Sequence, residues 1–72
     1  MESELFRYLV PFRYKGYDRI GQIVDGIGRT MVVLDHEIRT MDDVLSIEDT
    51  IEDQNPAYFD VVVQGWYRFA DL

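Results

Sequence analysis

Residues 40–56, TMDDVLSIEDTIEDQNP, predict a single amphipathic helix, and the rest of the fold is interpreted around it. Thr40 is expected to cap the N-terminus, with Asp43 three residues later as a shortened capping box. Apolar residues recur at helical spacing and give the helix one side that packs on a sheet: Val44, Ile47 and Ile51, flanked by Met41 and Leu45. The residue before Pro56 disfavours helical dihedrals, so the helix is predicted at about residues 41–53.

The first strand is predicted over residues 6–14, where aromatic and apolar residues occupy every second position. Pro11 has no amide hydrogen to donate to a ladder, so this strand is expected at a sheet edge or with a bulge. Residues 15–18 predict a turn.

The next segment allows two interpretations. In the first, residues 20–24 and 29–35 are separate strands around a hairpin turn at Asp25-Gly26. In the second, residues 20–35 form one long strand, bent by a glycine bulge between Gly26 and Gly28.

The last strand is predicted over residues 59–69, with alternating side chains throughout. The whole chain, residues 1–72, is then a single α+β domain: a small, mainly antiparallel sheet of three or four strands, with one helix on one face. One helix cannot cover both faces of a sheet. The opposite face is expected to carry Trp66, Val62, Leu9 and Leu5, and to pair the protein into a homodimer or a higher homo-oligomer.

Composition narrows the function. The 72 residues carry a net charge of −7, which disfavours attraction to duplex nucleic acid. No apolar stretch approaches the length that spans a membrane, and Glu2, Glu4 and Arg7 do not fit a signal peptide. There is no cysteine, which fits a reducing cytoplasm and excludes a cysteine-based zinc site.

Catalytic and cofactor motifs are not recognisable. Gly26-Ile27-Gly28 lacks the third glycine of a dinucleotide fingerprint, and a strand rather than a helix follows it. Asp35, His36 and Glu37 are consecutive residues at a strand end and point to different sides, which indicates a solvated loop rather than an acid–base site. We therefore expect no enzymatic activity, no cofactor and no metal.

The acidic side of the helix is the first candidate binding surface. Its carboxylates are expected to dock on a basic patch of another protein: Asp42, Asp43, Glu48, Asp49, Glu52 and Asp53. A solvated helix face explains the same residues without any function.

A basic and aromatic group is the second candidate surface. Arginines interleaved with aromatic rings suit a nucleotide, because guanidinium groups bind phosphate and rings stack on bases. Its members are Arg7, Arg13, Arg19, Arg29, Tyr17 and Trp66. Arg7 and Arg13 are about 20 Å apart on one strand at ~3.3 Å per residue, so they would meet one phosphate only in an oligomer. Tyrosines in the core and solvated arginines are the alternative explanation.

The chain resembles a family of very short tailed-phage proteins. The pattern consists of Gly26-x-Gly28, an apolar run, then the residues from Ile38 to Val44, Ile47-Glu48, Asn55-Pro56 and the residues from Val61 to Trp66. The resemblance covers about residues 26–69 and implies a stoichiometric inhibitor of a host defence protein, or an oligomeric sponge for a signalling nucleotide. It carries no functional residue over to this chain. On the charge, the inhibitor acting through the acidic helix is the favoured hypothesis.

Overall fold

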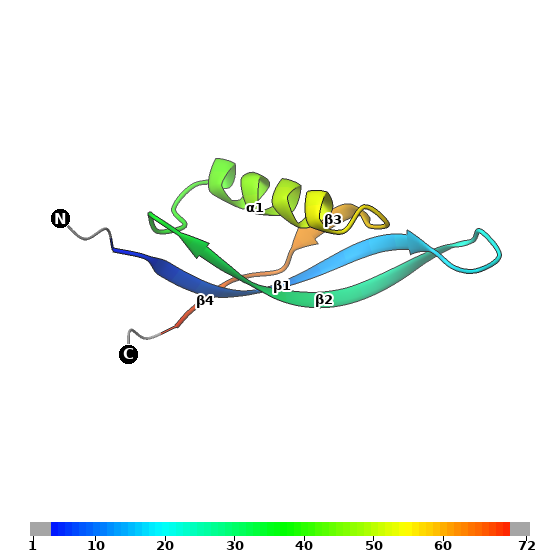
Figure 1. Cartoon of the computed structure of the whole chain (residues 1–72), viewed down its shortest axis with the longest axis horizontal. Coiled ribbons are helices and arrows are strands. Elements are labelled where there is room, and N and C mark those ends of the chain that lie inside the picture. Colours follow the sequence, from blue (N-terminus) through cyan, green and yellow to red (C-terminus); the bar gives the residue numbers. More distant parts are fainter. Residues whose placement is uncertain (1–3, 70–72) are drawn as a thin grey trace.

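The computed structural model describes residues 4–69 and places five elements in the order strand, strand, helix, strand, strand (Figure 1). Their bounds are β1 Phe6–Tyr17, β2 Ile23–Leu34, α1 Met41–Gln54, β3 Phe59–Val63 and β4 Tyr67–Arg68. The sheet has four strands and α1 packs on one face, which confirms the predicted small α+β fold. The predicted helix is also confirmed, with Thr40 and Asp43 forming its capping box.

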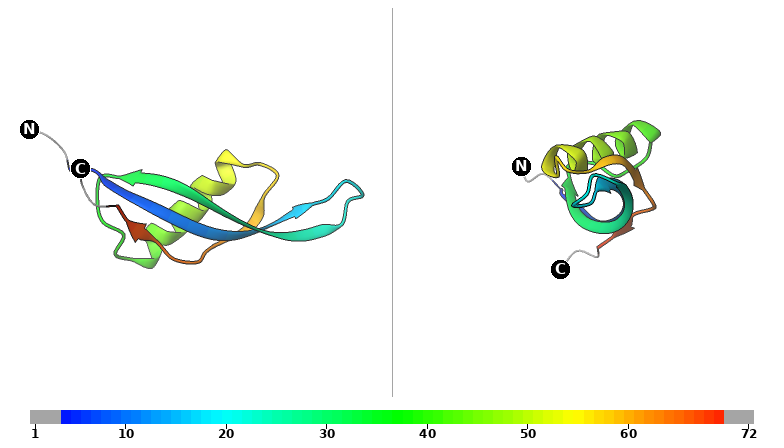
Figure 2. Two further views of the ribbon diagram at one scale, coloured as in Figure 1. Left: turned by 90° about the horizontal axis from the view of Figure 1, so that it is seen from below. Right: turned by 90° about the vertical axis from the view of Figure 1, so that its right-hand side faces the viewer.

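β1 is the central strand of the sheet. Its whole length pairs with β2, while β3 and β4 pair with different parts of its other edge, and every pairing is antiparallel. The molecule measures 52 × 23 × 18 Å, because the β1–β2 hairpin extends well past the end of the helix (Figure 1). Seen end on, the hairpin is coiled, with α1 against one side of it (Figure 2).

The hairpin turn lies earlier in the chain than Asp25-Gly26, so that prediction is wrong. β1 and β2 pair without interruption from Phe6–Leu34 to Tyr17–Ile23, and the chain reverses over residues 18–22. Asp18 Oδ1 accepts hydrogen bonds from the amides of Ile20 and Gln22 at 3.0 and 2.9 Å. Gly21 takes a φ of +83°, which glycine adopts without a steric cost. A side chain that bonds its own turn and a glycine in the left-handed region therefore set the reversal.

Gly26 and Gly28 lie within β2, which is one strand, without the predicted bulge. Each faces an aromatic residue of β1, and the ring covers the glycine. A Cβ on Gly26 would lie 2.3 Å from the ring of Tyr14, and one on Gly28 would lie 2.7 Å from the ring of Phe12. These glycines therefore admit rings from the neighbouring strand instead of forming a turn.

Pro11 lies in the central strand, at neither an edge nor a bulge of the β1–β2 pairing, so that prediction is also wrong. β3 pairs with β1 from Phe12 onward and β4 pairs with Leu9 and Tyr8. Pro11 faces the gap between them, where its carbonyl accepts a hydrogen bond from the Gln64 amide at 2.9 Å. The missing amide hydrogen of proline costs nothing at this position, because no ladder partner is there to accept it.

The predicted strand over residues 59–69 is broken into β3 and β4, which changes which side chains share a face. Asp60 has a φ of +50°, at the point where the register between β1 and β3 shifts. Two residues of β3 therefore oppose one of β1, as in a bulge. Tyr67, not Trp66, stands opposite Leu9. Trp66 lies in the connection between β3 and β4 and is only half-exposed.

The core lies between α1 and the half of the sheet nearest the start of β1. Alternate residues of β1 point to the helix, and Val10 is fully buried there. The other buried side chains are Tyr8, Phe12, Ile38, Ile47, Ile51 and Val61. The Tyr8 hydroxyl accepts a hydrogen bond from the Ile38 amide at 3.2 Å, which fixes the loop that leads into the helix.

Candidate functional site

The acidic residues of α1 divide into two groups, of which the first serves the fold. Asp43 Oδ2 accepts hydrogen bonds from the amides of Arg39 and Thr40 at 2.9 and 3.1 Å, and these bonds lower its pKa to about 2. Glu48 accepts a 2.7 Å bond from the Val63 amide. Glu52 accepts a 3.2 Å bond from the Val61 amide. These three carboxylates hold the start of the helix and join the helix to β3.

The second group is Asp42, Asp49 and Asp53, which are exposed. Their spacing of seven and four residues places them on one side of the helix, away from buried Ile47 and Ile51. No hydrogen bond or ion pair with another described residue engages them. The predicted docking surface is therefore reduced to one row of three carboxylates.

His36 lies at the N-terminal end of α1 and bridges two carboxylates. Its Nδ1 is 2.6 Å from Asp35 Oδ1 and its Nε2 is 3.1 Å from Asp43 Oδ1. The hydrogen bond with Asp35, followed by that with Asp43, raises the pKa of His36. Glu37 instead contacts Arg39 and Arg68. Asp35 and His36 are exposed, as a solvated loop requires. The prediction that consecutive side chains here point to different sides is wrong for these two residues, because they are hydrogen-bonded, and the bridge from His36 to Asp43 was not predicted.

The basic residues also divide into two groups. Three of them form ion pairs: Lys15 with Asp60 at 3.8 Å, Arg39 with Glu37 at 3.1 Å, and Arg68 with Glu37 at 3.0 Å and Glu4 at 3.6 Å. The other four make no ion pair within residues 4–69: Arg7, Arg13, Arg19 and Arg29. They are the four arginines that the sequence proposed as ligand-binding residues.

The structure brings together only two of these arginines. Arg29 pairs with Pro11 and Arg13 with Ile27, so the two arginines are diagonal neighbours on adjacent strands. Arg7 lies farther along β1, and Arg19 lies in the hairpin turn.

The two predicted stacking residues are also separate. Tyr17 contacts Phe59 near the hairpin turn, with ring centroids 5.2 Å apart. Trp66 lies in the connection between β3 and β4. The predicted nucleotide site is therefore not assembled within one chain.

The sheet face that points away from α1 carries many exposed apolar side chains; we call it the outer sheet face. It consists of the odd-numbered residues of β1 and β2, with Val62 of β3 and Tyr67 of β4. Ile27, Met31 and Tyr67 are 82%, 58% and 65% exposed. The strand pairing places its side chains in rows across the sheet, among them Ile27–Arg13–Val62, Met31–Leu9–Tyr67 and Val33–Arg7.

Sequence reasoning anticipated this face but missed most of its residues. Val62 and Leu9 were assigned to it correctly, whereas Ile27, Met31 and Tyr67 were not. The alternation of residues 25–34 carries the signal: every even position is half-buried, and every odd one is exposed.

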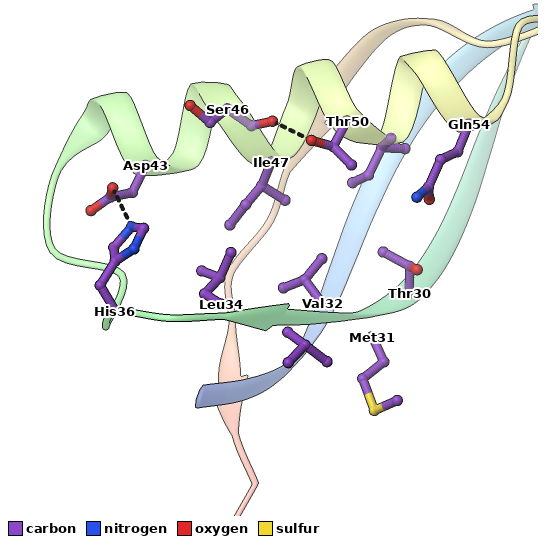
Figure 3. Close-up of a pocket in the computed structure, with 12 residues that line it drawn as sticks. Thr30, Met31, Val32, Leu34, His36, Asp43, Ser46, Ile47, Thr50 and Gln54 are labelled. Carbon is purple, nitrogen blue, oxygen red and sulfur yellow. Dashed lines mark hydrogen bonds and ion pairs between the residues drawn. The ribbon is translucent and has the colours of Figure 1, made fainter. Parts of the chain in front are cut away.

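A groove of about 350 Å³ separates α1 from β2 (Figure 3). Val32 and Leu34 of β2 and Ile47 of α1 supply apolar walls, and Ser46, Thr50 and Gln54 line the helix side. Met31 points to the other side of the strand. The groove exists because α1 lies closest to β3 and packs its buried residues on those of β1, while the residues of β2 are only partly buried.

Neither a membrane-spanning helix nor a metal site is found in the described part of the chain. No helix there is long and apolar enough to cross a membrane, and no three acidic or histidine residues cluster as a metal site. No family model matches the sequence, and no curated protein or solved structure matches it significantly. The resemblance to short tailed-phage proteins therefore stays a prediction.

Proposed function

We propose that this protein is a non-enzymatic binding protein that contacts another protein through its outer sheet face. The observation that carries the proposal is the composition of that face. Exposed apolar side chains alternate with Arg7, Arg13 and Arg29, which have no ion-pair partner among the described residues. Asp25 is the one carboxylate among the odd-numbered residues of β1 and β2.

The composition of this face indicates which kind of partner surface it would bind. Protein interfaces are enriched in aromatic residues, methionine and arginine and depleted in lysine and acids, and large exposed apolar patches mark binding sites. The matching surface is apolar with carboxylates around it. Binding would place Arg7 and Arg13 beside acidic groups while Met31 and Tyr67 leave water.

The acidic helix is the weaker candidate for the same role. Three of its six carboxylates already bond within the chain, and the remaining three form a single row with exposed Leu45 and Met41 beside it. Inhibition of a host defence protein, which the phage resemblance implies, needs only one tight protein contact, and the outer sheet face offers more exposed apolar side chains for it than the helix row does.

The test compares two charge-reversed variants of the full chain as affinity baits. Arg7→Glu with Arg13→Glu alters the outer sheet face, and Asp42→Lys with Asp49→Lys alters the helix row by the same amount. Retained proteins are identified by mass spectrometry, and the Kd of the purified partner is measured by calorimetry. We expect the arginine variant to weaken the Kd by about tenfold or more, because each reversed charge opposes a carboxylate at the contact.

The opposite pattern would assign binding to the acidic helix and reject the outer sheet face. Both variants fold if their circular dichroism spectra and unfolding midpoints match those of the wild-type chain. The nucleotide sponge is the second candidate, supported by the unpaired neighbours Arg13 and Arg29. Calorimetry with cyclic and ADP-ribose-type nucleotides tests it. Submicromolar binding that Arg13→Glu abolishes would favour the sponge.

A further inference from the structure

The two edges of the sheet are not equivalent. β3 and the two-residue strand β4 share one edge, and on β3 the amides of Val61 and Val63 donate to Glu52 and Glu48 of α1. These carboxylates occupy the donors that another strand would need. The β3 edge is therefore closed by the helix of the same chain.

β2 forms the other edge and is open along its length. Within residues 4–69 no strand pairs with the side of β2 that faces away from β1. The strand has 12 residues with neither proline nor lysine, and it pairs with β1 without a bulge. Natural sheets often protect a long edge strand with a proline, a lysine or a bulge, because an unprotected edge recruits another strand.

The residues that present free backbone groups follow from the ladder. The amides of Gln64 and Phe69 donate to Pro11 and Arg7, so odd-numbered residues of β1 bond toward β3 and β4. The backbone groups of even-numbered residues of β1 therefore form their hydrogen bonds with β2, and the residues that they pair with in β2 are also even-numbered. The odd-numbered residues of β2 from Ile23 to Val33 thus direct their N–H and C=O groups outward.

We propose that β2 pairs antiparallel with β2 of a second copy of this chain, about a two-fold axis at Ile27. This register places Asp25 opposite Arg29 of the partner subunit, and Arg29 opposite Asp25 of the partner subunit. Ile23 then lies opposite the partner's Met31. Ile27 lies beside the partner's Ile27, which covers part of a side chain that is 82% exposed in the single chain.

The charges select this register over its neighbours. Shifting the axis to Asp25 or to Arg29 brings two like charges together, which is unfavourable across a strand pair. An axis at Gly26 or Gly28 places Asp25 and Arg29 opposite apolar residues, so neither forms an ion pair. Only the axis at Ile27 forms two opposite-charge pairs, and each joins groups that have no ion-pair partner in the described chain.

The groove between α1 and β2 adds to the fit. In the proposed register, Val24 of the partner subunit lies opposite Thr30, on the sheet side that faces the helix. The hairpin end of each copy then lies beside Val32 and Leu34 of the other, at the open side of the groove. The result is a continuous sheet with both helices on one side and both outer sheet faces on the other.

Cysteine cross-linking tests the register, because the natural chain has no cysteine. In the proposed dimer the two Cα atoms of residue 27 are about 5.5 Å apart, within the range of a disulfide. The two copies of residue 23 are about 26 Å apart at ~3.3 Å per residue. We expect Ile27→Cys to form a disulfide dimer under mild oxidation at micromolar concentration, and the matched exposed control Ile23→Cys to stay monomeric. Equal cross-linking of the two variants, or preference for Ile23→Cys, would overturn the proposal.

Charge reversal provides a second measurement with no new covalent bond. Sedimentation equilibrium of the full chain should show a monomer–dimer equilibrium. Asp25→Arg or Arg29→Asp alone should weaken the dimer Kd by about tenfold, since each substitution acts at two symmetric pairs. The double variant should recover most of the loss. A wild-type chain that is still monomeric at about 100 μM would disprove the pairing, and so would single variants with the dimer Kd of the wild-type chain.

Discussion

At the scale of single residues, the contact between Gly28 and Phe12 shows why sequence rules placed the turn wrongly. Phe12 is buried, and its ring atoms lie 2.7, 3.1 and 3.3 Å from where a Cβ of residue 28 would be. The ring therefore excludes any side chain there. A glycine that makes room for a ring has the same letter as a glycine that makes a turn, and only the strand opposite distinguishes them.

Replacing Gly28 with alanine should destabilise the protein by about 1–3 kcal/mol, because the buried Phe12 ring must move. Gly16→Ala is the matched control. Gly16 lies in the neighbouring strand, and its new Cβ would meet only the Ala57 carbonyl at an ordinary 3.5 Å. Urea unfolding of both variants measures the difference. Equal stability of the two variants would mean that the ring does not constrain position 28.

His36 makes the stability of the helix start depend on pH. Its folded pKa is raised above 6.5, so its contribution is complete below about pH 6.5 and is lost as pH rises through the raised folded value. Asp43 acts in the other direction. Its pKa is lowered from 3.8 to about 2, so its contribution is complete above pH 3.8 and is lost as pH falls through about 2. The helix start is therefore most stable between these two ranges.

The single histidine gives this prediction a direct measurement, because its NMR signals need no separate assignment. Titration should give a pKa for His36 above 6.5. Asp35→Asn should lower that pKa, since the Asp35 hydrogen bond is the largest cause of the shift. Asp42→Asn removes a nearby carboxylate that does not contact the ring and should change the pKa much less. A wild-type pKa at or below 6.5 would contradict the bridge.

At the scale of elements, α1 is joined to β3 by side chains as well as by packing. The Glu48 and Glu52 carboxylates accept from strand amides, and both bonds are partly buried. Glu48→Ala should destabilise the protein by about 1.5–3 kcal/mol, the range of a hydrogen bond to a charged group. The exposed Asp49→Ala should change stability by less than about 0.5 kcal/mol.

Hydrogen exchange separates this effect from a general loss of helix. In Glu48→Ala the Val63 amide should exchange faster relative to amides at the centre of β1. If Glu48→Ala and Asp49→Ala lower the unfolding midpoint equally, Glu48 does not act through the Val63 amide.

The elements also show how far sequence patterns reach. Helical periodicity and capping residues are local, and they predicted α1, Thr40 and Asp43 correctly. Strand boundaries depend on partners distant in sequence: the bulge at Asp60 and the gap opposite Pro11 follow from how β3 and β4 meet β1. The same applies to the candidate site. Composition identified the four unpaired arginines, but their separation on the sheet is set by register, which no local pattern contains.

At the scale of the whole molecule, the core occupies one end and the hairpin extends beyond it. The radius of gyration is 14.0 Å, against about 11 Å for a compact domain of 72 residues. A small domain with such a shape depends strongly on each core residue. Stability should therefore be concentrated around α1, and the far end of the hairpin should contribute little.

Two substitutions test this distribution. Ile51→Ala, at the centre of the core, should destabilise the protein by about 2–5 kcal/mol, which is a large share of the stability of a domain this small. Ile20 lies in the hairpin turn and is 77% exposed, so Ile20→Ala should cost less than about 0.5 kcal/mol. Unfolding is measured at low protein concentration so that association does not contribute. Comparable losses would show that the hairpin end belongs to the cooperative core.

The contacts of Glu48 and Glu52 with β3 have one more consequence, which concerns how far assembly proceeds. A sheet with two open edges adds copies without limit and grows into a fibril, whereas a sheet with one open edge stops after the first addition. With the β2 pairing proposed above, the two carboxylates on the helix would limit assembly to a dimer, because they occupy the β3 amides. Removing both of them should therefore change more than stability: a second edge becomes available for strand pairing, and the expected product is a filament.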